Sequence, residues 1–83
     1  MVIAGVVIDV KTDQAVAAMA ALEGMPGISR LEGPVTPGRL AAVLEAENEA
    51  EVTDLCTRML TAPGVVNVNP AFIHFDVEEE SRV

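Results

Sequence analysis

The side chains able to do chemistry are few, and their spacing does not form a catalytic set. His74 is the single histidine and Cys56 the single cysteine among 83 residues. A lone cysteine rules out an intramolecular disulfide, and one thiol with one imidazole has no metal-ligand spacing. Ser29 and Ser81 have no histidine placed to activate them as nucleophiles. We therefore expect no metal, no bound cofactor and no enzymatic activity.

The remaining candidates for chemistry are carboxylates near the ends of two apolar runs. Asp9 and Glu45 could share general acid and base roles if they lay together, but no spacing places them in one site. The glycines fall at expected turns, except Gly5 within an apolar run, so the sequence has no glycine-rich phosphate loop. These patterns favour a binding protein over an enzyme.

The charge balance restricts the class of partner. Thirteen acidic residues against five basic ones give a net charge of −8. A nucleic acid is a poor partner for this surface, because phosphate binding needs clusters of lysine and arginine. A cationic partner fits better, although solubility alone also accounts for the acidity. The first apolar run is too short to span a membrane and follows no basic segment, so we expect a cytoplasmic protein without membrane insertion.

An internal repeat predicts the fold. Met25-Pro26-Gly27-Ile28 recurs thirty-seven residues later as Ala62-Pro63-Gly64-Val65. Each copy follows an amphipathic segment, and each amphipathic segment follows an apolar run. The same shift matches apolar helix positions one by one, Val52, Leu55, Cys56 and Met59 with Ala15, Ala18, Met19 and Leu22. Two strand–helix–strand units predict an α+β, ferredoxin-like βαββαβ sandwich, a four-stranded antiparallel sheet with two helices on one face.

The expected elements fill one domain over residues 1–77, followed by an acidic flexible tail at 78–83. Strands are predicted at 2–10, 28–32, 39–46 and 65–75, with a breaker-rich loop at 33–38. Thr12 or Asp13 can cap the first helix, and Asn48 with Glu51 should give the second helix a start that resembles a capping box. Strands one and three should be central, with two and four at the edges. Pro70 then lies where a strand tolerates proline, at an edge or bulge.

The central strands suggest where binding occurs. Antiparallel strands with one solvated face should alternate apolar and polar residues, whereas strands one and three are apolar on both faces. The face away from the helices should therefore expose an apolar patch, which usually marks a binding surface. Homodimerisation through the sheet is the alternative explanation. The predicted binding residues are Ile3, Gly5, Val7 and Asp9 on strand one, Ala41, Val43 and Glu45 on strand three, and Asn67, Asn69, Ala71 and Ile73 on strand four.

One end of this face is expected to be strongly negative. The ends of strands three and four should bring Glu45 and Glu47 near Asp76 and the acidic tail. The opposite end offers Asp9 together with Lys11. A cationic segment should therefore favour the first end, with Glu45 as its best single acceptor because a carboxylate can meet an arginine fork with two oxygens.

The chain resembles the NapD family over residues 3–76. The likeness rests on four stretches: Gly5-Val6-Val7-Ile8; Leu22 through Met25-Pro26-Gly27-Ile28; Gly38-Arg39-Leu40 to Val43-Leu44-Glu45-Ala46-Glu47; and Pro63-Gly64-Val65-Val66 to Phe72-Ile73-His74-Phe75-Asp76. The last stretch departs from the family ending, with Phe72 at an aromatic position, Ile73 at the first histidine and Pro70 in place of an aliphatic residue.

The resemblance implies a small cytoplasmic chaperone for the catalytic subunit of periplasmic nitrate reductase. Such a protein binds the twin-arginine signal peptide of that subunit and restrains its export until the molybdenum cofactor and iron–sulfur cluster are in place. It binds neither cofactor itself, and we expect mainly a monomer. The signal peptide has basic residues followed by an apolar segment, which complements an acidic protein with an apolar sheet face.

Two alternatives come from other classes of protein. A small ligand-binding regulatory module shares the ferredoxin-like fold and acts as a dimer, but such modules usually accompany a DNA-binding or catalytic domain. A structural homodimer without a ligand is the other. Size-exclusion chromatography with light scattering separates both from the chaperone hypothesis, because each requires a dimer.

Overall fold

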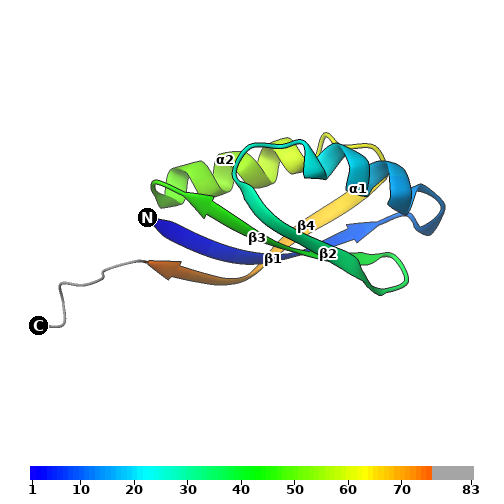
Figure 1. Ribbon diagram of the computed structural model, residues 1–83, viewed down its shortest axis with the longest axis horizontal. Helices are drawn as coiled ribbons and strands as arrows, with labels where there is room; N and C mark the ends of the chain where they lie inside the picture. Colours follow the sequence, from blue (N-terminus) through cyan, green and yellow to red (C-terminus); the bar gives the residue numbers. More distant parts are fainter. Residues whose placement is uncertain (76–83) are drawn as a thin grey trace, which may run out of the picture.

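The computed structural model describes residues 1–75, and these form a two-layer sandwich (Figure 1). The elements follow in the order β1 (Val2–Val10), the 3₁₀ turn η1 (Thr12–Gln14), α1 (Ala15–Glu23), β2 (Ile28–Thr36), β3 (Arg39–Ala46), α2 (Glu49–Met59) and β4 (Val65–Phe75). The strands form one sheet in the order β2-β3-β1-β4, and all neighbours are antiparallel. Both helices cover the same face of this sheet. The predicted ferredoxin-like fold and strand order are confirmed. Residues 76 and 77 and the predicted tail lie outside the described residues.

The core lies between the helices and one face of the sheet. Leu22 of α1 and Met59 of α2, which the repeat makes equivalent, are both fully buried. The helix-facing residues of the central strands are buried as well, namely Val2, Ala4, Val6, Ile8 and Val10 on β1 and Leu40, Ala42 and Leu44 on β3. The predicted helix faces are therefore confirmed. Since the core holds only aliphatic side chains and one Met thioether, packing rather than polar contacts stabilises it.

The two helices begin differently. At α2 the backbone N–H of Glu51 donates to Asn48 Oδ1 at 2.9 Å, and the Glu51 carboxylate accepts from the N–H of Glu47 at 2.9 Å. This confirms the predicted capping arrangement. At α1 the prediction of a Thr12 or Asp13 cap is wrong. Both residues belong to η1, and the N-cap of α1 is Gln14, without a side-chain cap hydrogen bond.

The segment 33–38 is mostly strand rather than the predicted loop. β2 continues to Thr36, which pairs with Arg39 and leaves Pro37-Gly38 as a two-residue turn. The ladder is irregular between Glu32 and Thr36. Pro34 has no partner in the β2–β3 register, and an edge strand tolerates a proline at such a position. Proline and glycine therefore interrupt the register here without ending the strand.

The repeated Pro-Gly turns tie each half to a central strand. Gly27 and Gly64 both have positive φ, 97° and 79°, which a side chain would disfavour. The carbonyl of Gly27 accepts from the N–H of Glu45 at 2.9 Å, and that of Gly64 accepts from the N–H of Lys11 at 2.8 Å. The two copies of the repeat therefore form turns of equivalent conformation and hydrogen bonding.

Candidate binding face of the sheet

The open face is the side of the sheet that no helix covers among the described residues (Figure 1). Its residues on the central strands follow from the register, which pairs Ile3 with Glu45, Gly5 with Val43, Val7 with Ala41 and Asp9 with Arg39. All these residues alternate with buried, helix-facing ones. The structure therefore places the seven predicted residues of strands one and three together on the open face.

On β4 the alternation changes partway along the strand. Asn67 and Asn69 lie opposite Asp9 and Val7, so both belong to the open face as expected. The register then shifts between Gly5 and Val6, where Pro70 pairs with Val6 and Phe72 pairs with Gly5. The shift leaves Ala71 as the extra residue of a β-bulge, which changes the side to which the following residues point.

The bulge corrects the prediction for Ile73. Its partner is Ala4, whose side chain belongs to the core, so Ile73 lies on the helix side of the sheet instead of the open face. Phe72 and His74 take the open-face positions, opposite Gly5 and Ile3. Strict alternation missed these two residues. Pro70 was the available signal, because proline in a strand is found at edges and bulges.

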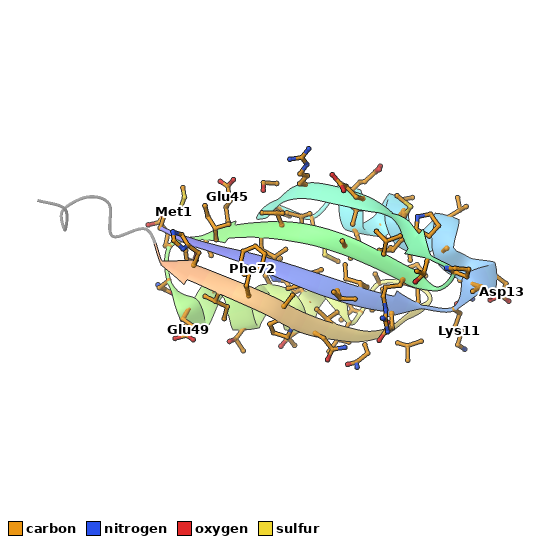
Figure 2. The ribbon with its side chains drawn as sticks, turned by 90° about the horizontal axis from the view of Figure 1, so that it is seen from below. Met1, Lys11, Asp13, Glu45, Glu49 and Phe72 are labelled. Carbon is orange, nitrogen blue, oxygen red and sulfur yellow. The ribbon has the colours of Figure 1, made fainter. Side chains whose placement is uncertain are left out.

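Phe72 lies over the middle of the open face (Figure 2). Its ring covers Gly5 so closely that a Cβ at Gly5 would come within 2.8 Å of Phe72 Cδ2 and Cζ. Gly5 is consequently buried, although we expected it to be an open position for an approaching ligand. The ring itself remains exposed. Gly5 therefore makes room for an aromatic side chain of the same protein.

Beside the ring the open face is hollowed. The hollow has a volume of about 290 Å³. Its apolar lining comes from the two central strands and from the bulge of β4, and it comprises Gly5, Val6, Val7, Ala41, Ala42, Val43, Ala71 and Phe72. Arg30 and Glu32 of β2 complete the lining on the outer side. This volume is near the lower end of ordinary ligand pockets, so the hollow suits small apolar groups.

Charged residues on the open face are mostly paired with each other. Arg39 Nε lies 2.9 Å from Asp9 Oδ1, and Arg30 Nε lies 3.1 Å from Glu32 Oε2. Asp9, a predicted site acid, is thus already neutralised by a cross-strand neighbour. Glu45 is exposed and makes no ion pair within residues 1–75. Of the two predicted acids, Glu45 is therefore the one available to a cation.

Glu45 shares a row of the sheet with Ile3 and His74. Ile3 pairs with Glu45 on one side and with His74 on the other, so the row crosses β3, β1 and β4. Figure 2 shows Glu45 near Met1, at the end of the sheet opposite Lys11 and Asp13. Asp76 and the acidic tail, expected beside Glu45, lie outside the described residues. Within the described part, Glu45 is the acid that the strand register places on the open face at this end, while Glu47 follows β3 and donates its N–H to Glu51 at the start of α2.

The other chemically capable residues do not gather into a site. Cys56 is half-buried on α2, and burial raises the pKa of its thiol, so the thiol stays protonated at neutral pH. Over residues 1–75, no group of three or more His, Cys, Asp and Glu side chains could hold a metal ion. No helix in this part of the chain is long and apolar enough to cross a membrane.

Comparison with known families identifies the group of proteins to which this chain is related. The model of the NapD family, described as NapD protein, matches residues 1–77. The chain belongs to the NapD family. The stretches that carry the NapD resemblance occupy the two central strands, both Pro-Gly turns and β4. The family match thus covers all elements that build the open face.

Solved structures share the fold of this NapD-family chain. The solution structure of E. coli NapD, a Tat proofreading chaperone, has a TM-score of 0.75 and 20% identity, covering 98% of this chain and 84% of that one. A crystal structure of a protein from Thermus thermophilus has a TM-score of 0.80 and 22% identity, covering 90% of this chain and 94% of that one. No curated protein sequence matched significantly.

A transcriptional regulatory protein of the ASNC family from Pyrococcus furiosus also shares the fold. Its TM-score is 0.69 at 14% identity, and the match covers 98% of this chain but 54% of that one. At these identities the structural likenesses show the fold alone. The fold is therefore common to NapD and to a regulatory protein, and membership of the NapD family rests on the family model.

Proposed function

We propose that this protein is a cytoplasmic maturation chaperone that binds the twin-arginine signal peptide of the catalytic subunit of periplasmic nitrate reductase. Binding restrains export of that subunit until its cofactors are loaded, and the chaperone itself holds no cofactor and catalyses no reaction. Membership of the NapD family and the description of E. coli NapD as a Tat proofreading chaperone support this role. The observation that carries the proposal is the hollowed apolar face beside an available acid, Glu45.

The chemistry of a signal peptide matches this face in two parts. Its apolar segment gains free energy by leaving water, and the hollow between Phe72 and β3 offers an apolar surface for it. Its arginines require carboxylate acceptors, and the protein carries a net charge of −8. Because Arg39 already neutralises Asp9, the arginines favour the end of the open face that holds Glu45.

A titration tests the proposal directly. The synthetic signal peptide of the nitrate reductase subunit is added to isotopically labelled protein, and amide shifts are followed by NMR. We expect the largest shifts on β1, β3 and β4, and a 1:1 complex by light scattering. A peptide with both arginines replaced by glutamine serves as the control and should bind more weakly. Absence of binding, or shifts confined to the outer faces of α1 and α2, would contradict the proposal.

The charge of Glu45 provides a second test. Glu45→Lys should weaken binding about fivefold at low salt, because exposed ion pairs contribute only about 0–1 kcal/mol each. The loss should appear mainly in the association rate and should shrink as salt shortens the screening length. Stopped-flow measurements at several salt concentrations measure this effect.

Glu23→Lys is the matched control, because Glu23 is an exposed acid on α1 and its replacement changes the net charge by the same amount. Glu23→Lys should retain most of the association rate. The peptide without arginines should be insensitive to Glu45→Lys. Equal losses for the two peptides would place the arginines elsewhere. Combining Glu45→Lys with Asp76→Lys tests whether the acid following β4 contributes as well.

The alternative of a regulatory dimer makes a different prediction for the free protein. The fold shared with the ASNC-family regulator and the apolar open face are the observations in its favour. If the protein is a chaperone, light scattering should show mainly a monomer at every protein concentration measured. A stable dimer that fails to dissociate when peptide is added would favour the alternative.

A further inference from the structure

Phe72 is the unusual residue of the open face. It is one of only two aromatic residues in the chain, and it stands 54% exposed over the centre of the sheet (Figure 2). Two local features put it there. The bulge at Ala71 turns Phe72 to the open face, and Gly5 leaves the space into which its ring fits. The bulge and Gly5 together hold a large apolar side chain at the surface, a position that burial in the core does not explain.

The ring forms one wall of the hollow, and β3 forms the floor beside it. Ala41 and Val43 line this floor, so the groups nearest the ring are aliphatic. The charges of Arg30 and Glu32 are directed to one another at 3.1 Å. An arginine that enters the hollow would lose its hydrogen bonds to water and would find no unpaired acceptor there. An aliphatic side chain has no such hydrogen bonds to lose. The hollow therefore discriminates against charge.

The position of the hollow also relates it to Glu45. Phe72, Gly5 and Val43 occupy one row of the sheet, and Glu45 lies in the row two residues along β3. Two residues of a strand span roughly 7 Å. A peptide that places a cation at Glu45 would therefore bring a nearby apolar residue over the hollow.

We propose, on the basis of the function proposed above, that Phe72 is the specificity-determining residue of the open face. Its ring, held in place by Gly5, clamps one aliphatic side chain of the apolar segment against Ala41 and Val43. This single anchored side chain sets the register of the peptide relative to Glu45. Aromatic residues near the centre of an interface commonly supply most of the binding free energy, which agrees with this assignment.

A double-mutant cycle tests the assignment through the contact between Phe72 and Gly5. Phe72→Ala should weaken binding of the signal peptide about tenfold, as measured by calorimetry. Gly5→Ala should weaken it as well, because the added methyl displaces the ring from the sheet. In the double variant the methyl no longer meets a ring, so binding should be no weaker than in Phe72→Ala. Val16→Ala, which truncates a highly exposed side chain on α1, should bind like the wild type.

A scan of the peptide adds a measurement that a merely structural role of Phe72 would not affect. Each aliphatic residue of the apolar segment is replaced in turn by alanine. At one position of the peptide, the replacement by alanine should weaken binding to the wild-type protein about tenfold. The same replacement should change binding to Phe72→Ala only slightly. Unchanged binding by Phe72→Ala, or losses of Phe72→Ala and Gly5→Ala that multiply in the double variant, would overturn the assignment while leaving the chaperone function intact. A wild-type protein that does not bind the peptide would overturn both.

Discussion

Truncating Leu22 or Met59 to alanine is expected to lower the free energy of unfolding by about 2–5 kcal/mol. Both side chains are fully buried between the helices and the sheet, at equivalent positions of the internal repeat. Removing either one loses burial of apolar surface and leaves a cavity that the close-packed core fills only partly. A domain of this size has a total stability of about 5–10 kcal/mol, so each loss is a large share of it.

Urea denaturation followed by circular dichroism measures these losses. The control for Leu22 is Val16 on the same helix, and the control for Met59 is Leu60 at the C-terminal end of α2. Val16 on α1 is 84% exposed and Leu60, next to Met59, is 46% exposed. Val16→Ala and Leu60→Ala should therefore cost much less than the buried truncations. Losses of similar size for the buried and the exposed pair would mean that the helix faces are assigned incorrectly.

Replacing Ala41 with tryptophan is expected to weaken binding of the signal peptide by at least about a hundredfold. Ala41 lies opposite Val7 on the open face and lines the hollow. An indole at this position would occupy the hollow and leave no room for a side chain of the peptide. Because Ala41 does not belong to the helix-side core, the variant should keep a stability close to that of the wild type.

The matched control is Ala17→Trp, the same substitution at an exposed position of α1. It should bind the peptide normally, and both variants should unfold cooperatively in the denaturation experiment. Normal binding by Ala41→Trp would exclude the open face as the peptide site. Gly5→Trp would be a less direct probe of the open face, because the new side chain would first meet the ring of Phe72.

Much of the fold could be predicted from the sequence because it depends on local patterns. The Pro-Gly repeat and the matched positions of Leu22 and Met59 define two equivalent units, and right-handed crossovers place both helices on one face. Asn48 and Glu51 were recognisable as a cap because capping involves residues three apart. Alternation along β1 and β3 similarly identified the open-face residues, because these strands pair without interruption.

The tertiary structure decided what depends on contacts between strands distant in sequence. Thr36 belongs to a strand because it pairs with Arg39, despite the prolines and glycines around it. Asp9 is neutralised because the register places Arg39 beside it. The β4 bulge exchanges Ile73 for Phe72 on the open face, since one extra residue reverses the alternation beyond it. Periodicity counts residues along one strand, whereas the pairing of two strands determines which side chains share a face.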